Sequence, residues 1–264
     1  MKKKTTKRPA KKAAASSKRT SPANQVLYLY GVTRAAGPAP QAAGVDGKAA
    51  VASVPCSGLT CWVSRVDARE YGAELERNIE NLDWLAEASV RHQRVVAELS
   101  QDRTVLPARF GTVFLSEKTL AADVAKRKKD MESALRRLAD ADEWGVKVFR
   151  VDQPVHTAMA AASGRDYLSQ KAAMLKPAGA QQVAPEIREL ADALSKVAAD
   201  AVPAGKVSSG QRGLEWQASF LVRRADRKKW DEVLARFARR WGYERRIETS
   251  GPWPPYSFVS RHAR

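Results

Sequence analysis

Histidine and cysteine most often bind metals or act as bases and nucleophiles, and this chain has few of them. Its 264 residues include three histidines, at positions 92, 156 and 262, and two cysteines, at positions 56 and 61. No two histidines have the spacing of metal ligands, and the spacing of Cys56 and Cys61 is not that of a Cys-x-x-Cys zinc or redox motif. His92 is either a ligand or base, or a hydrogen-bonded histidine at the edge of a helical core.

Motifs for phosphate, dinucleotide and acyl-transfer chemistry are also missing. The sequence has no Gly-x-x-x-x-Gly-Lys, Gly-x-Gly-x-x-Gly or Gly-x-Ser-x-Gly pattern. Its paired acids, such as Glu74 with Glu76 and Asp140 with Asp142, fall on polar helix faces or at helix ends, where solvation and ion pairing account for them. We therefore expect no catalytic residue, cofactor site, metal ligand or small-molecule substrate, and a protein that is not an enzyme.

The charge is strongly basic and unevenly placed. The chain has 46 Lys and Arg against 29 Asp and Glu, a formal charge of +17. Residues 1–20 carry nine basic side chains and no acid, and residues 215–264 carry twelve basic and six acidic side chains. The first segment lacks the apolar residues that folding needs, so residues 1–23 are predicted to be a disordered arm. The arm is either a solubilising tail or a polyanion-binding segment, which would use Lys2, Lys3, Lys4, Lys7, Arg8, Lys11 and Lys12.

Hydrophobic periodicity predicts an α+β fold. Apolar residues recur at helical spacing between Leu75 and Leu99 and again between Leu120 and Leu138, after a Ser116 start signal. Together with the predicted strands, this gives the order β-β-α-β-α-β and a ferredoxin-like split βαβ domain over residues 24–152. The four strands of this order are expected near Gln25–Thr33, Leu59–Val66, Thr104–Phe114 and Glu143–Val151, with a further short strand near Lys48–Val54.

The second half is predicted to be a smaller α+β domain, residues 153–264. Residues 156–204 are rich in Ala and mainly helical, Lys206–Ser209 and Leu214–Arg223 are predicted strands, and a last helix runs from an Asp226 cap to Gly242. No apolar run approaches the roughly 18 residues that span a bilayer, so we expect no membrane span.

The segment after this domain is rich in proline and aromatic residues. Pro252, Pro254 and Pro255 fix φ and remove backbone donors, so an extended segment is expected. Trp253, Tyr256 and Phe258 would then be either anchors for a partner or a strap packed on their own domain.

The extended run Thr104–Phe114 is the other candidate contact surface, because Pro107 indicates an edge strand or a bulge. Phe110 and Phe114 would supply apolar contact there. Arg109 would either pair with a partner carboxylate or be an ordinary surface arginine.

Taken in order along the chain, several short stretches resemble the gas vesicle protein L/F family (GvpL/GvpF). The resemblance covers about residues 25–260. The stretches are Tyr28–Val32, Asn81–Leu85 followed by His92, Thr104–Phe114, Glu143–Lys147, Gly164–Leu168, Phe220–Val222 and Gly251–Phe258.

The resemblance implies a non-enzymatic accessory or minor structural protein of gas vesicle assembly, built from two α+β domains. Its expected partners are the small hydrophobic wall subunit, which it would keep soluble or help to nucleate into the shell, and other accessory proteins. Its expected location is the gas vesicle, and the cytoplasm during assembly. The alternative from charge alone is a nucleic-acid-binding protein that uses the basic arm.

Overall fold

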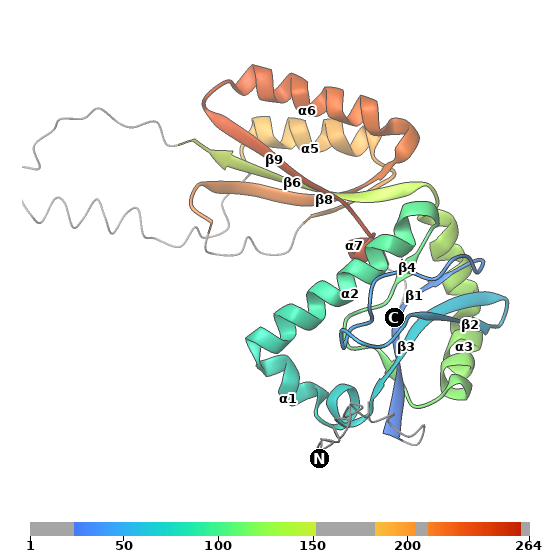
Figure 1. Cartoon of the computed structure of the whole chain (residues 1–264). Helices are drawn as coiled ribbons and strands as arrows, with labels where there is room; N and C mark the ends of the chain where they lie inside the picture. The colour runs from blue at the N-terminus through green and yellow to red at the C-terminus, as the bar shows by residue number, and fades with distance from the viewer. Residues whose placement is uncertain (1–23, 152–182, 204–210, 260–264) are drawn as a thin grey trace, which may run out of the picture.

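The computed structural model describes residues 24–151, 183–203 and 211–259, which form two lobes (Figure 1). We call residues 24–138 the N-terminal lobe and the described residues of 141–253 the C-terminal lobe. The predicted basic arm, the predicted strand Lys206–Ser209 and most of the predicted helical region 156–204 lie outside the described residues.

The N-terminal lobe is built on an antiparallel sheet whose central strand is β1, Gln25–Thr33. The sheet order is β2-β3-β1-β4, and β5 also pairs with β1. The partner strands are β2 (Ala52–Cys56), β3 (Leu59–Asp67), β4 (Leu106–Pro107) and β5 (Val113–Phe114).

Strand β1 is buried on both faces because a long helix covers each side of the sheet. Tyr28 and Tyr30 pack in the cluster beneath α2 (Leu82–Asp102), whereas Leu27 and Leu29 pack in the cluster beneath α3 (Glu117–Arg137). Figure 1 shows the two helices on opposite sides of the strands. The N-terminal lobe is thus a three-layer unit with two apolar cores.

Side-chain caps fix the start of both long helices. The Asn81 side chain accepts hydrogen bonds from the backbone N–H groups of Asp83 and Trp84, and Ser116 and Thr119 form a capping box. A π-helical turn at Arg69–Ala73 and the short helix α1, Leu75–Glu80, lead into α2.

The C-terminal lobe is a second antiparallel sheet, in the order β7-β8-β6-β9. Helices α5 and α6 lie together over one face of it (Figure 1), where Val146, Phe220 and Trp230 form the core. Its elements are β6 (Ala141–Arg150), α5 (Pro185–Val197), β7 (Asp200–Pro203), β8 (Leu214–Arg223), the 3-10 turn Arg224–Asp226, α6 (Arg227–Trp241) and β9 (Arg245–Trp253).

The placement of the ferredoxin-like unit at residues 24–152 was wrong. Residues 34–51 contain no helix between β1 and β2, and β6, expected as the last strand of this unit, pairs with β8 and β9 of the other sheet. The described elements β6, α5, β7, β8, α6 and β9 instead follow the order β-α-β-β-α-β. In their sheet, β8 is inserted between β6 and β7. Periodicity identifies a strand but not the sheet that it joins, which is why the strand was assigned to the wrong lobe.

Candidate functional site

The two lobes meet at the proline-aromatic segment that begins with the last residue of β9, which we call the strap, residues 253–259. Pro254 and Pro255 are buried, and Tyr256–Val259 form the short helix α7, which lies between the lobes in Figure 1. The expectation of an extended segment therefore holds only as far as Pro255. Beyond it no proline blocks a helical turn, and Tyr256 and Phe258 donate backbone hydrogen bonds to the carbonyls of Pro254 and Pro255.

Phe258 fixes the end of the strap. Its side chain is fully buried in the same cluster as Leu135 of α3 and Leu221 of β8, so it belongs to the core shared by both lobes. The guanidinium of Arg137 donates to the Phe258 carbonyl at 2.5 Å and pairs with Asp200 of β7 at 3.2 Å. Phe258 is therefore a packing residue in this structure.

A buried carboxylate holds the start of α7. Glu143, in β6, is only 7% exposed. It accepts hydrogen bonds from the Ser257 backbone N–H at 2.9 Å and from the Ser257 hydroxyl at 2.5 Å. The negative charge sits where the free N–H groups of a helical turn point, which is favourable electrostatically.

His92 is packed between two tyrosines. Its Nδ1 lies 2.9 Å from the Tyr28 hydroxyl and its Nε2 lies 3.0 Å from the Tyr256 hydroxyl. Burial lowers the pKa of His92 to about 4 and raises the pKa of both tyrosines. Of the two possibilities for His92, the structure agrees with the hydrogen-bonded core histidine, because both ring nitrogens are occupied within the protein.

An apolar groove of about 370 Å³ opens beside the strap, on the outer side of α2. Val90 of α2 is 57% exposed and Trp253 is 49% exposed, so both present apolar surface to solvent. We call this the α2–strap groove. Its lining residues are Val90, Gln93, Arg94, Ala97, Glu143, Trp253, Pro254 and Tyr256.

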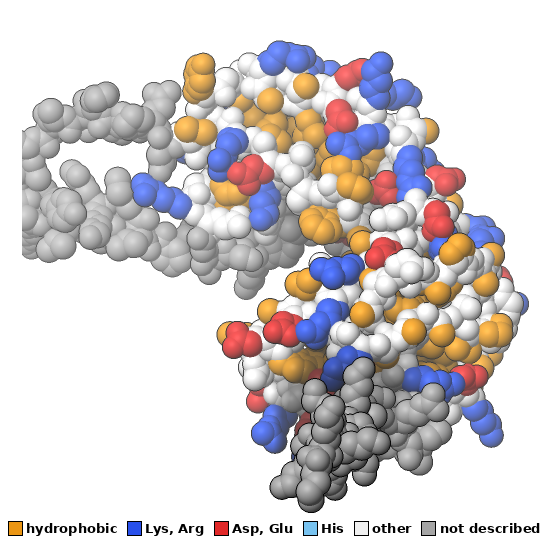
Figure 2. Space-filling model, viewed as in Figure 1, with side chains coloured by type: hydrophobic (Ala, Val, Ile, Leu, Met, Phe, Trp, Pro, Cys, Tyr) orange, Lys and Arg blue, Asp and Glu red, His pale blue; other side chains and the backbone are white. Residues whose placement is uncertain are grey.

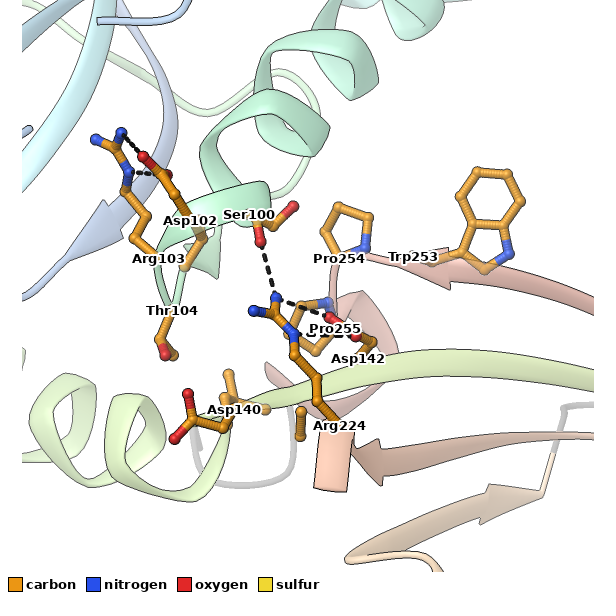
Figure 3. A pocket seen from close by; sticks show the side chains of 13 residues that line it. Ser100, Asp102, Arg103, Thr104, Asp140, Asp142, Arg224, Trp253, Pro254 and Pro255 are labelled. Atoms are coloured by element: carbon orange, nitrogen blue, oxygen red, sulfur yellow. Dashed lines mark hydrogen bonds and ion pairs between the residues drawn. The ribbon is translucent and has the colours of Figure 1, made fainter. Parts of the chain in front are cut away.

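A smaller polar pocket of about 190 Å³ lies next to the groove, and Trp253 and Pro254 line both (Figure 3). Across it, Arg224 of the C-terminal lobe pairs with Asp142 at 3.2 Å and donates to the Ser100 carbonyl of α2 at 3.1 Å. In Figure 3, Arg103 turns away from Arg224 and pairs with Asp102. Arg224 thus contacts both lobes across this polar pocket, whereas the lining of the α2–strap groove is mainly apolar.

The predicted contact residues fall in different environments. Trp253 and Tyr256 line the groove, whereas Phe110 is not among its lining residues and packs against His92, with ring centroids 5.8 Å apart. Phe114, in β5, is half-buried against the core of the N-terminal lobe, whereas Arg109 is exposed in the turn before Gly111. Helix α7 packs against β4, so the predicted edge strand is partly covered.

The groove residues of α2 were missed at the sequence level. Val90 and Ala97 fall outside the apolar stripe that faces the core, and on an exposed helix face such residues are common. The available signal was that Leu82, Ala86, Val90 and Ala97 recur on one outward face of the helix.

The described residues show no group of three or more His, Cys, Asp or Glu arranged to hold a metal ion. Cys56 and Cys61 are free thiols buried in the core, and burial raises the pKa of Cys61. Within the same described ranges, no helix is long and apolar enough to cross a membrane.

Comparison with known proteins gives one consistent result. The model of the family "Gas vesicle synthesis protein GvpL/GvpF" matches residues 26–260. Gas vesicle protein L of Streptomyces sp. (strain CB03234) is 31% identical over 252 residues, covering 89% of this chain and 93% of that protein. Gas vesicle protein F of Haloferax mediterranei is 26% identical over 238 residues, covering 89% of this chain and 94% of that protein.

The fold agrees with the same assignment. The crystal structure of GvpF from Anabaena sp. PCC7120 superposes with a TM-score of 0.62 at 20% identity, covering 89% of this chain and 96% of that chain. The GvpF structure from Microcystis aeruginosa gives 0.61 at 19% identity, covering 89% and 98%. By the family match and the relatives together, the chain belongs to the gas vesicle GvpL/GvpF family of proteins involved in gas vesicle formation.

Proposed function

We propose that this chain is a non-enzymatic accessory or minor structural protein that binds the apolar wall subunit of the gas vesicle at the α2–strap groove. The observation that supports this most directly is the open apolar lining of the groove. Val90 and Trp253 are about half exposed and face the same cavity from two different lobes. Apolar surface of this kind, bordered by polar residues such as Gln93 and Arg94, is typical of a protein-binding site.

The groove suits an apolar segment of a partner better than a small polar ligand. Trp253 offers a large, rigid ring, and the small side chain of Ala97 leaves room for close approach. A subunit that exposes apolar surface self-associates, and a protein that covers this surface delays that association. The same contact would keep the wall subunit soluble in the cytoplasm during assembly or nucleate the shell at the gas vesicle, together with other accessory proteins.

We also propose that the two lobes are two structural domains, each with its own sheet. The apolar cluster beneath α2 and the cluster beneath α5 and α6 each draw on one lobe, which supports this division. In the sequence the change of lobe then falls between α3 and β6, before the expected boundary at residue 152.

Co-purification with the wall subunit tests the groove. We expect Trp253→Ala combined with Val90→Asp to lower the amount of wall subunit recovered at least tenfold. The matched control combines Tyr243→Ala with Leu115→Asp, since these side chains are 88% and 81% exposed and lie outside the groove. Equal recovery by the folded groove variant and the wild type would exclude this site.

The basic arm gives the second candidate function, nucleic-acid binding. This function predicts duplex DNA binding that weakens steeply with salt and disappears when residues 2–20 are deleted. DNA binding of that kind, combined with wall-subunit recovery unaffected by the groove variant, would favour it over the first proposal.

A further inference from the structure

The outward face of α6 carries three basic side chains that have no ion-pair partner among the described residues. Seven basic residues of the C-terminal lobe are paired with acids. Lys228, Arg236 and Arg239 are exposed and form no ion pair with another described residue. The ion pairs are Arg150–Glu215, Arg224–Asp142, Arg227–Asp231, Lys229–Asp226, Arg240–Glu189, Arg245–Glu215 and Arg246–Glu248.

These three side chains lie on one stripe of the helix. At 100° and 1.5 Å per residue, Lys228, Arg236 and Arg239 fall within an arc of about 80° and a length of about 16 Å. Figure 2 shows Lys and Arg side chains along the edge of the molecule formed by α6. Glu232 lies on the same stripe, between the first and second basic residue, and Tyr243, just beyond the helix, is 88% exposed.

The start of α6 adds to the positive potential. The first turn of the helix contains Lys228 and Lys229 and no acidic residue, although the helix dipole is already positive there. Asp226 at the N-cap makes no capping hydrogen bond with its side chain. This arrangement is unfavourable for the isolated helix and becomes favourable when a partner places carboxylates beside it.

We infer that the outward face of α6 is a docking surface for an acidic helix of another protein, with carboxylates opposite Lys228, Arg236 and Arg239 and a basic residue opposite Glu232. The interruption at Glu232 is what favours a helix over a nucleic acid. A phosphate backbone is continuously negative and would be repelled at Glu232, whereas a helix can present one basic side chain at that position. The surface does not involve the α2–strap groove and is independent of the proposed wall-subunit site.

An NMR titration of the full chain tests this inference at millimolar peptide and low salt, where weak ion-pair binding is measurable. The probe is an alanine-based helical peptide with three Glu and one Lys at the spacing of Arg239, Arg236, Glu232 and Lys228. A second peptide of the same composition exchanges the Lys with one Glu. We expect amide shifts along residues 228–243, with the first peptide binding at least threefold more tightly than the second.

Charge reversal gives the matched comparison. The variant Lys228→Glu, Arg236→Glu, Arg239→Glu is expected to weaken peptide binding at least tenfold. A control with the same change in net charge reverses Lys118, Lys126 and Lys129, which are exposed on α3, and is expected to stay within twofold of the wild type. The neutral variant Lys228→Gln, Arg236→Gln, Arg239→Gln is expected to bind the peptide with an affinity between those of the reversal variant and the wild type. It provides the same test if charge reversal perturbs the fold.

Glu232→Lys separates the two classes of partner. The Glu232→Lys variant is expected to bind the acidic peptide that contains the Lys about threefold or more weakly than the wild type does. A duplex DNA probe of equal charge is expected to bind the Glu232→Lys variant more tightly than the wild type. The inference is overturned if the peptide shifts map to another surface, if the α3 control weakens binding as much as the α6 variant, or if DNA occupies α6 of the wild type more tightly than the peptide.

Discussion

The hydroxyl of Tyr256 lies 3.0 Å from Nε2 of His92, although the two residues are 164 positions apart in the chain. Because Tyr28 occupies the other ring nitrogen, His92 connects β1 of the N-terminal lobe to the strap. A neutral imidazole has one donor and one acceptor nitrogen, and hydroxyl groups can complement both. This relationship is a structural link between the lobes, and it makes the strap sensitive to changes at a single buried side chain.

Removing one hydroxyl is expected to weaken that link. Tyr256→Phe leaves a ring nitrogen of His92 buried without its partner, so the free energy of unfolding should fall by about 1–3 kcal/mol. Urea unfolding followed by circular dichroism measures this change. Tyr243→Phe is the matched control because that side chain is 88% exposed and should leave stability within about 0.5 kcal/mol of the wild type. Equal stability of the two variants would contradict the link.

The pH dependence of stability should show the buried histidine. The pKa of His92 is about 4 in the folded chain, below its ordinary value of 6.5, so between these values the unfolded chain binds the proton more readily. The contribution of His92 to the free energy of unfolding is therefore fully present above pH 6.5. It falls as the pH drops toward 4, by about 3 kcal/mol in total. Urea unfolding at several pH values measures this change. The free energy of unfolding should depend less steeply on pH for His92→Gln, which retains His156 and His262, than for the wild type.

The carboxylate of Glu143 should control how firmly α7 is held. Glu143→Ala removes the acceptor of both Ser257 hydrogen bonds and is expected to speed amide hydrogen exchange across residues 256–259. Amides in the centre of β3 serve as the internal reference, since that strand lies within the other sheet. Unchanged exchange of the strap in a folded variant would show that the carboxylate does not hold it.

Two aromatic residues of the strap should have different roles: Phe258 should stabilise the fold, and Trp253 should bind the wall subunit. Phe258→Ala empties a fully buried position and should cost about 3–5 kcal/mol of stability. Trp253→Ala removes a half-exposed ring and should cost less than about 1 kcal/mol while it lowers wall-subunit binding. Thermal unfolding and co-purification on the same two variants check both halves of this expectation.

Gly251 should be intolerant of a side chain. Its φ is +135°, and an added Cβ would lie 2.8 Å from the Glu143 carbonyl oxygen and 2.9 Å from the Trp144 ring. Gly251→Ala is therefore expected to cost about 2–4 kcal/mol of stability through backbone strain and displacement of β6. Gly72→Ala is the comparison, because its Cβ would meet only one atom, at 4.0 Å, and should be tolerated.

The individual elements could be predicted from the sequence because local signals determine them. Gln25–Thr33 is a strand as expected, Ser116 starts α3 with its side-chain cap, and Gly242 ends α6. These signals act over one or two turns of chain, where residue type determines the available φ, ψ and hydrogen bonds.

The pairing of β6 could not be predicted in the same way. Its residues alternate between faces like those of any half-buried strand, and both possible sheets offer apolar surface. The same limit applies to the groove, since Val90 and Trp253 come together only through the docking of the strap on α2. Tyr256 and Phe258 have the aromatic character of a contact surface; in the structure Phe258 is fully buried, whereas Tyr256 both contacts His92 and lines the groove.

The position of Phe258 has a consequence for synthesis on the ribosome. This side chain completes the core beneath α3, but it is translated only after every strand and helix of the C-terminal lobe. While the second sheet is being synthesised, the core beneath α3 of the nascent N-terminal lobe therefore lacks the Phe258 side chain. The finished chain closes its first lobe last, so premature termination anywhere in the C-terminal lobe would leave both lobes incomplete.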